Sequence, residues 1–357
     1  MPKKYSATNY IKNTAKKAVR KKARKAARKN PFAVFLLLLI LALGAYLTLC
    51  ACDYNDIDLG FDYDLGDTNI IDIIAPKPDD DYDDYDDDDT TLLPTDGYVA
   101  YHFIDVGQGD AILITTPEGN ILVDTSEAKA EEALDKYLKS AGVESIKYLV
   151  LTHPDADHIG NASFILENYQ VDNVIMGEYA NATTKTFEKL LDTIEEKAVP
   201  LQLVGVGDSF EVGGVYNRII APIANYKDSN ENSLVIRSSF GEIVVMLTGD
   251  AEHKSEADIV ESGRWDSDDL EADVLKVGHH GSNSSTTEEF LDAVSPKYAV
   301  ISCGEGNKYG HPHDETIDLL AEKGIEVYRT DLLGTIIFKT DGKTFTSIDT
   351  VKTEPEG

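Results

Sequence analysis

The chain has 357 residues and a formal net charge of −31, with 33 Lys and Arg against 64 Asp and Glu. So acidic a chain repels polyanions and offers few phosphate contacts, which argues against a protein that coats nucleic acid. With 3 cysteines it has no disulfide framework, and Cys303, in the apolar run AVISCG, is expected to be a buried strand residue rather than a catalytic thiol.

The N-terminal region combines a basic arm with an apolar segment. Residues 1–30 carry 12 Lys or Arg and no acid, and residues 31–51 then run without any charge. That apolar length can cross a bilayer as a transmembrane helix or signal anchor. Because positive residues stay on the cytoplasmic side, the arm would be cytoplasmic and the rest extracellular. The sequence therefore predicts a single-pass protein of the cell membrane that contacts the lipid bilayer through residues 31–51.

Other interpretations of this region stay open. Signal cleavage would release a secreted protein, and processing at Cys52 would produce a lipoprotein. The basic arm could also bind nucleic acid or anionic lipid. An uncleaved anchor is favoured because the apolar run is longer than that of most signal peptides and its basic lead is unusually long.

The next segment, residues 52–96, holds 17 acidic residues and one lysine. It is too charged and too poor in apolar residues to form a core, so we interpret it as a disordered acidic linker. Its paired aspartates lack the glycine and the terminal glutamate of a calcium loop, which favours a self-repelling spacer.

Residues 97–351 read as one globular domain, followed by a tail at 352–357, and residues 97–357 together carry a net charge of about −27. Strands are expected at 98–107, 110–116, 121–125, 146–151, 171–176, 200–204, 209–214, 216–223, 232–240, 242–249, 272–278, 296–302, 326–330 and 335–340. Helices are expected at 127–142, 161–169, 184–198, 253–263, 286–294 and 314–324. Many strands connect directly by turns, which favours a layered α/β sandwich over an all-parallel barrel.

Polar residues gather where these strands end. The loops that carry them contain Asp124, the run HPDADH (153–158), Asp250, the pair His279 and His280, and the pair His311 and His313. Each aspartate alone could be a helix cap. However, these loops hold six of the 8 histidines, and strand ends at one edge of an α/β sheet are where sites form. Imidazole and carboxylate together are the ligands of catalytic zinc or manganese.

The spacing within HPDADH suits metal ions. His153 and Asp155 can converge on one cation from an extended loop, while Asp157 and His158 can turn to a second.

HPDADH also resembles the HxHxDH signature of the metallo-β-lactamase fold superfamily, with Asp155 where a second histidine usually stands. FIDVGQGDAILI, LVDT, NSLVI, LTGDAE, LKVGHHGSNSS and YGHPH extend the resemblance, in order, over nearly all of residues 98–340. Together they resemble the hydrolase-like domain of ComEC-type competence proteins and its free-standing extracellular relatives. The resemblance implies a four-layer αββα sandwich.

The resemblance also implies roles for individual residues. The implied metal ligands are His153, Asp155, Asp157, His158, Asp250 and His280. Asp250 would bridge two ions, and Asp124 would orient ligands from behind them. His279 and His311 would contact substrate or transfer protons, although either member of the pair 279–280 could be the ligand.

The chain departs from the family pattern at one ligand of the first of the two metal ions. The superfamily usually supplies another histidine before the bridging aspartate, yet none occurs between His158 and His253. Asn232 or Ser233 is expected at that place, so the chain would hold one or two ions. The many carboxylate ligands make Mn²⁺ a rival to Zn²⁺.

The expected activity is that of an extracellular metal-dependent phosphodiesterase or nuclease, with Asp157, His279 and His311 as catalytic residues and His311 as proton donor. The substrate would be a phosphodiester, with DNA as one candidate, and a local basic patch would comprise Lys276, Lys308 and Arg237. Two alternatives are hydrolysis of a non-phosphate bond such as an ester or lactam, and a non-catalytic accessory module for DNA uptake or envelope processing. Either could involve membrane-associated partner proteins.

Overall fold

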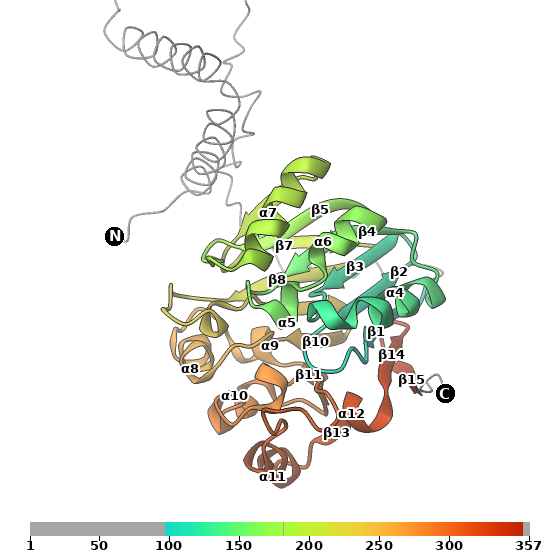
Figure 1. The fold of residues 1–357 in the computed structure, drawn as a ribbon. Coiled ribbons are helices and arrows are strands. Elements are labelled where there is room, and N and C mark those ends of the chain that lie inside the picture. Colours follow the sequence, from blue (N-terminus) through green and yellow to red (C-terminus); the bar gives the residue numbers. More distant parts are fainter. Residues whose placement is uncertain (1–96, 181, 353–357) are drawn as a thin grey trace, which may run out of the picture. The chain divides into compact units, whose positions relative to one another are not determined.

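The structure is a computed structural model that describes residues 97–180 and 182–352 (Figure 1). The predicted basic arm, the membrane segment 31–51 and the acidic linker lie outside the described residues, as does the tail after residue 352. Within the described part, no helix is both long and apolar enough to cross a bilayer.

Eight strands form the first sheet, in the order β15-β14-β1-β2-β3-β4-β5-β6. Their bounds are β1 Val99–Phe103, β2 Ile112–Thr116, β3 Gly119–Val123, β4 Ser145–Leu151, β5 Gln170–Gly177, β6 Leu201–Val204, β14 Thr335–Thr340 and β15 Phe345–Val351. The strands from β3 to β6 are parallel, and the remaining pairs are antiparallel.

Seven strands form the second sheet, in the order β13-β12-β11-β10-β9-β8-β7. Their bounds are β7 Ser209–Val212, β8 Val215–Ala221, β9 Val235–Phe240, β10 Ile243–Leu247, β11 Val274–Lys276, β12 Tyr298–Ile301 and β13 Glu326–Arg329. The strands from β10 to β13 are parallel, so their carboxyl ends lie at the same edge of the sheet.

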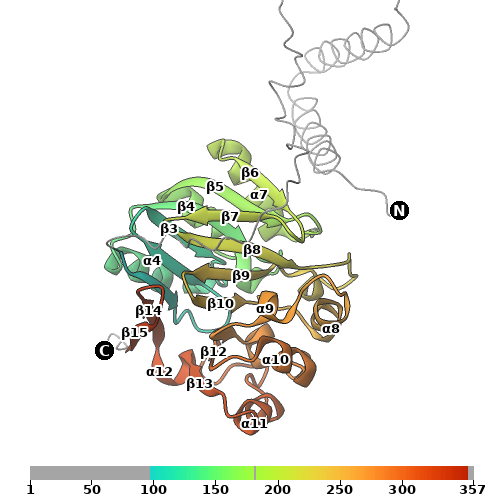
Figure 2. The ribbon, with the colours of Figure 1, turned by 180° about the vertical axis from the view of Figure 1, so that it is seen from behind.

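Helices cover the outer face of each sheet (Figures 1 and 2). Those against the first sheet are α4 Glu131–Ser140, α5 Ala156–Ile159, α6 Ala162–Asn168 and α7 Lys185–Lys197. Those against the second are α8 His253–Glu261, α9 Ser267–Leu270, α10 Glu288–Val294 and α11 Asp314–Glu322, and α12 Thr330–Leu333 joins β13 to β14.

Alternating side chains build the layers. In β2, Ile112 and Ile114 join the core between the two sheets, whereas Leu113 joins the core beneath the helices of the first sheet. A third core lies between the second sheet and its helices, around residues such as Phe290. The predicted α/β sandwich is confirmed as two facing sheets with helices outside them.

Some elements differ from the sequence prediction. Strand β15 and the short helices α9 and α12 were not predicted. Strand β15 lies at the sheet edge, and its side chains are half-buried or exposed, so it lacks the apolar run that identifies a buried strand. Cys303 is buried, as predicted.

His102 in β1 gives the fold a sensitivity to acid. Its ring nitrogens lie 2.7 Å from the Tyr137 hydroxyl and 3.3 Å from Thr115 Oγ1. Burial lowers the pKa of His102 to about 4, whereas an unfolded histidine titrates near 6.5. Between these values the unfolded chain binds a proton that the folded chain does not, so stability is lost as the pH falls from about 6.5 to about 4.

We expect His102→Gln to lose less stability over this pH interval than the parent chain, by up to about 3 kcal/mol. Urea denaturation at pH 4.5, 5.5 and 7, with EDTA present throughout, measures the difference. Parallel stability curves for the two proteins would contradict the assignment.

Candidate metal centre

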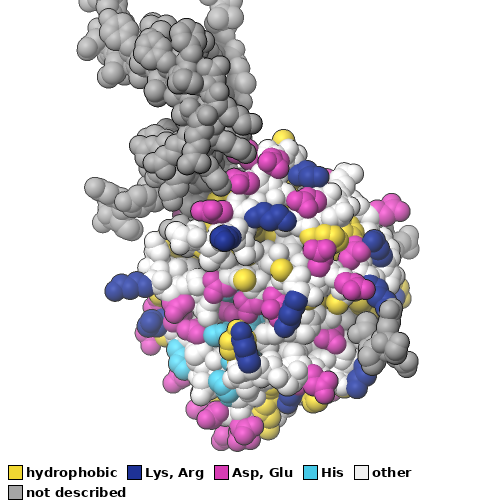
Figure 3. Space-filling view, viewed as in Figure 1, with side chains coloured by type: hydrophobic (Ala, Val, Ile, Leu, Met, Phe, Trp, Pro, Cys, Tyr) yellow, Lys and Arg dark blue, Asp and Glu magenta, His cyan; other side chains and the backbone are white. Residues whose placement is uncertain are grey.

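The predicted polar loops meet where the ends of the two sheets come together. Asp124 and residues 153–158 follow β3 and β4 of the first sheet, whereas Asp250 and residues 279–280 follow β10 and β11 of the second. Figure 3 shows histidine side chains at the surface beside a group of Asp and Glu side chains. The site thus draws residues from both sheets.

Asp250 lies at the centre of this site, and each of its carboxylate oxygens faces two imidazoles. Its Oδ1 atom is 3.1 Å from Nε2 of His158 and 3.5 Å from Nε2 of His280. Its Oδ2 atom is 3.9 Å from Nε2 of His153 and 3.8 Å from Nε2 of His279. The carboxylate is therefore placed between two pairs of nitrogen donors.

One half of this arrangement forms a compact cage. Oδ2 of Asp157 lies 3.6 Å from Nε2 of His280. The donor atoms of Asp157, His158, Asp250 and His280 all lie within 4.8 Å of one another. Nε2 of both histidines and Oδ1 of Asp250 are buried and have no hydrogen-bond partner among residues 97–180 and 182–352. Such atoms are costly to bury, and a divalent cation between them would satisfy all of them, so the cage fits one ion.

In each cage histidine, Nδ1 points away from the cage and contacts an oxygen atom of another residue. Nδ1 of His158 lies 2.7 Å from Oδ2 of Asp124, and Nδ1 of His280 lies 3.0 Å from the carbonyl oxygen of Ser302. Asp124 is itself fixed, because its Oδ1 accepts the backbone N–H of Thr152 at 2.8 Å. These contacts direct both Nε2 atoms into the cage, which is how metal-binding histidines are usually oriented.

The loop after β11 is bent so that both of its histidines turn inward. His279 and His280 have φ values of 46° and 56°, in the left-handed region that side chains other than glycine rarely adopt. Such strain concentrates at functional sites.

The second half of the arrangement is less complete. His153 is buried, and its Nε2 has no hydrogen-bond partner among the described residues. Asp155 is not part of the cage, and its carboxyl group hydrogen-bonds Ser229. Burial raises the pKa of Asp155 above its usual value, as does the charge of Asp157.

The structure distinguishes the two residues expected in place of the missing histidine. The Asn232 amide turns to its own loop, where Nδ2 donates to the carbonyl oxygens of Tyr226 and Asp228, both at 2.9 Å. Ser233 instead accepts the backbone N–H of Asp250 at 3.1 Å. Ser233 is therefore the residue beside Asp250, and it offers a weaker ligand than an imidazole.

Protons and a cation would compete for this site. Burial disfavours the charged form of Asp250, yet the charges of His158 and His280 hold the pKa of Asp250 well below its usual value. Burial likewise disfavours protonated His158, but Asp250 and Asp124 raise the pKa of His158 well above 6.5. A bound cation would displace these protons, so acid should weaken its binding.

The pKa values of His279 and His311 are shifted in opposite directions. Burial opposes protonation of His279, but its 2.9 Å contact with Glu252 and the charge of Asp250 raise the pKa of His279 above 6.5. Burial, together with the charges of neighbouring histidines, lowers the pKa of His311 to about 4. The two ring centroids are 5.4 Å apart. The site thus sets a more basic imidazole, His279, beside a less basic one, His311.

The predicted basic patch is wrong. Lys276 is completely buried and pairs with Asp110 at 2.9 Å. Arg237 is half-buried and donates to the carbonyl oxygen of Asp268. Lys308 does lie next to the site, with Nζ 4.8 Å from the centroid of the Tyr309 ring, which stacks on His311.

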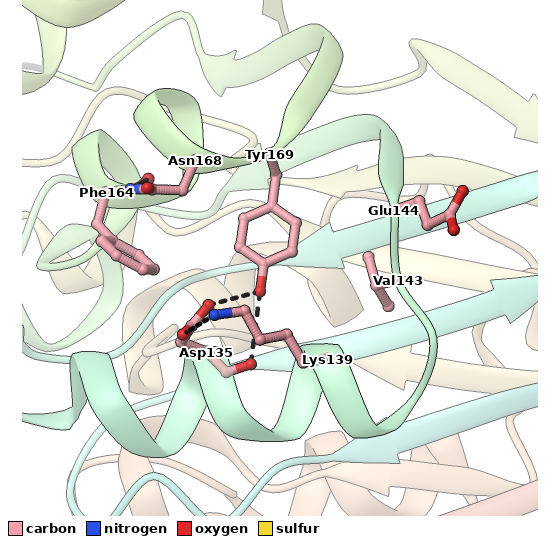
Figure 4. A pocket seen from close by; sticks show the side chains of 7 residues that line it. All are labelled: Asp135, Lys139, Val143, Glu144, Phe164, Asn168 and Tyr169. Carbon is pink, nitrogen blue, oxygen red and sulfur yellow. Dashed lines mark hydrogen bonds and ion pairs between the residues drawn. The ribbon is translucent and has the colours of Figure 1, made fainter.

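A separate surface pocket of about 380 Å³ lies beside helices α4 and α6 (Figure 4). It is lined by Asp135, Lys139, Val143, Glu144, Phe164, Asn168 and Tyr169. Asp135 accepts from Lys139 at 2.6 Å and from the Tyr169 hydroxyl at 2.8 Å. These three polar side chains hydrogen-bond one another, so they are less available to bind a ligand than the donor atoms of the cage.

Comparisons with known proteins point to the same fold. The family model of the metallo-beta-lactamase superfamily matches residues 104–305. ComE operon protein 3 of Bacillus subtilis is 34% identical over 255 residues, covering 66% of this chain and 32% of the relative. Competence protein ComA of Neisseria gonorrhoeae is 32% identical over 236 residues, covering 66% and 31%. Recombination protein 2 of Haemophilus influenzae is 33% identical over 241 residues, covering 65% and 28%.

These matches confirm the resemblance to ComEC-type competence proteins, although the chain spans about a third of the length of these relatives. Among solved structures, the metallo-beta-lactamase fold protein YhfI from Bacillus subtilis shares 12% identity at a TM-score of 0.44, covering 68% of this chain and all of that one. The diiron β-hydroxylase CmlA from Streptomyces venezuelae shares 14% identity at a TM-score of 0.45, covering 69% and 54%.

Proposed function

This chain belongs to the metallo-beta-lactamase superfamily, and we propose that it is a metal-dependent hydrolase of phosphodiester bonds. The observation that carries the proposal is the cage of Asp157, His158, Asp250 and His280, whose donor atoms lie within 4.8 Å of one another. Three of these atoms, from His158, Asp250 and His280, are buried without a hydrogen-bond partner among the described residues. The cage fits Zn²⁺ or Mn²⁺. When bound, such an ion supplies Lewis acidity and lowers the pKa of water to about 7, which makes hydroxide available at neutral pH.

The chain's own residues would handle the substrate beside the cage. His279 carries the raised pKa and is a stronger candidate than His311, the proton donor predicted from the sequence, for donating a proton to a leaving oxygen. His311, neutral at pH 7, would donate a hydrogen bond to a phosphoryl oxygen. Asp157 would hold the ion on the side of the cage that is partly open to solvent, since its side chain is 29% exposed.

The wider role that we propose is extracellular. The apolar segment 31–51 would anchor the chain in the cell membrane, or its cleavage would release the domain. Similarity to competence proteins supports DNA as one substrate, handled together with membrane-associated partner proteins. The net charge of about −27 on residues 97–357 favours a small phosphodiester over a long polyanion.

A non-catalytic or weakly catalytic accessory module is the second candidate. Ser233 in place of a histidine and the separate position of Asp155 favour it, because both weaken the second cation position. Such a module would bind a metal ion without turning over a substrate.

Hydrolysis assays separate these two candidates. We expect the purified full-length chain to hydrolyse bis-p-nitrophenyl phosphate once Zn²⁺ or Mn²⁺ is added, and Asp157→Ala to reduce the rate on the order of 10³-fold, because the cage loses a ligand. Single-stranded and duplex DNA assayed in parallel show whether polymers are substrates.

A control variant and two outcomes make this test decisive. Asp172→Ala removes a half-buried carboxylate that pairs with Lys147, and it should leave the rate unchanged. Turnover that survives in Asp157→Ala would overturn the proposed site. If no phosphodiester is turned over with either metal, the phosphodiesterase proposal falls, and hydrolysis of a non-phosphate bond and the accessory module are the alternatives that stay.

A further inference from the structure

Two sequence motifs meet beneath the cage. Asp110 belongs to VGQGDA, just before β2 of the first sheet, and Lys276 ends β11 of the second sheet. Nζ of Lys276 lies 2.9 Å from Oδ2 of Asp110, and 2.9 Å from the carbonyl oxygen of Val277. Both charged side chains have an exposed fraction of 0%. The ion pair thus bridges the two sheets out of contact with solvent.

Asp110 contacts the cage at two points. Its Oδ1 lies 3.4 Å from Nδ1 of His280, the ring nitrogen that faces away from the cage. Its backbone N–H donates to the carbonyl oxygen of Asp157 at 3.2 Å. Asp110 therefore supports one cage residue through its side chain and another through its backbone.

The positive charge of Lys276 and the negative charge of Asp110 both affect how strongly the cage would bind a cation. Four carboxylates gather around the site, namely Asp110, Asp124, Asp157 and Asp250, and Lys276 is the cation that pairs with one of them. Burying a lysine is expensive, and a buried ion pair usually stabilises a fold no better than an apolar pair of similar size. A fixed positive charge close to the cage would, however, counteract the attraction that the carboxylates exert on a divalent ion.

We propose that the ion pair of Asp110 and Lys276 positions His280 and sets the affinity of the cage for its cation, with Asp110 strengthening binding and Lys276 weakening it. Both are positioning residues, because neither donor atom belongs to the cage. The inference rests on the proposed function in one respect, since it requires that the cage bind a divalent ion.

Isothermal titration calorimetry of the full-length chain with Mn²⁺ alone, at pH 7.5, tests the proposal. Lys276→Met should tighten Mn²⁺ binding by about tenfold, and Asp110→Asn should weaken it by about tenfold. The double variant should return to within about threefold of the parent. A purely structural pair would instead weaken binding in both single variants, because either would loosen the cage.

Two further variants serve as controls. Lys147→Met removes a lysine from a half-buried pair with Asp172 between strands β4 and β5, and it should leave the Mn²⁺ affinity unchanged. His280→Ala removes a cage donor, so its titration measures the background from the acidic residues 52–96. If the parent chain binds Mn²⁺ no better than His280→Ala, the metal centre itself fails, whatever the ion pair does.

If the parent binds above that background and Lys276→Met binds equally or more weakly, the ion-pair proposal is overturned while the metal centre stands. Should Lys276→Met not fold, Asp110→Asn is compared with the double variant instead. Asp110→Asn keeps Lys276 without its carboxylate partner, whereas the double variant lacks the lysine. The double variant must then bind Mn²⁺ more tightly than Asp110→Asn. Equal or weaker binding would reject the proposal.

Discussion

Asp250→Asn is expected to abolish Mn²⁺ binding at the cage and to lower phosphodiesterase activity on the order of 10³-fold or more. Each Asp250 oxygen faces two imidazole nitrogens, at distances from 3.1 to 3.9 Å. An amide keeps the size of the side chain but replaces one acceptor oxygen with an N–H₂ donor and removes the charge. The variant thus loses the one group shared by both halves of the site.

Thermal unfolding with and without Mn²⁺ measures this effect independently of catalysis. A ligand that binds only the folded state raises the unfolding temperature, so the parent chain should be stabilised by added Mn²⁺ and Asp250→Asn should not. Glu256→Gln is the matched control. Glu256 is also a buried carboxylate, and it lies in helix α8, which packs against the second sheet. It accepts the backbone N–H groups of Thr286 and Thr287 and has no donor atom in the cage.

We expect Glu256→Gln to unfold at a lower temperature than the parent and yet to keep its stabilisation by Mn²⁺. If both variants lost that stabilisation equally, the effect would come from general loosening of the second sheet, and Asp250 would have no special role.

The positions of several residues in and behind the cage were predictable because they follow local signals. Asp124, His158 and Asp250 each come shortly after a short apolar run, and such runs identify buried strands from sequence alone. Parallel strands end at one edge, so these loops were expected to meet. The sequence could not show which oxygen faces which imidazole, because that depends on how the two sheets are stacked.

Residues whose role depends on contacts between the sheets could not be predicted. Lys276 was expected at the surface because lysine is rarely buried, and no pattern along the chain reveals that Asp110 receives it, 166 positions earlier. The choice between Asn232 and Ser233 likewise depended on a turn: the Asn232 amide closes its own loop and leaves Ser233 beside Asp250. The left-handed backbone of His279 and His280 has no signature in residue type.

Gly109→Ala is expected to destabilise the fold by about 3 kcal/mol and to weaken Mn²⁺ binding by about 10- to 100-fold. Gly109 has a φ of +117°, which other residues rarely adopt, and a Cβ atom placed there would lie 2.3 Å from the carbonyl oxygen of Asp157. The obstacle is backbone rather than a flexible side chain, so the loop that carries Asp157 must move away.

Gly107→Ala is the control that distinguishes the displacement of Asp157 from the backbone strain of a side chain at positive φ. Gly107 also has a positive φ, +71°, but a Cβ atom there would meet no atom within 4 Å. Its substitution should cost about 1 kcal/mol and leave the Mn²⁺ affinity intact. Urea denaturation and Mn²⁺ titration of both variants provide the comparison. Equal effects on affinity would mean that Asp157 does not depend on the close approach of Gly109. A selective loss in Gly109→Ala would show that the VGQGDA loop of the first sheet holds the cage in place through its backbone as well as through the Asp110 carboxylate.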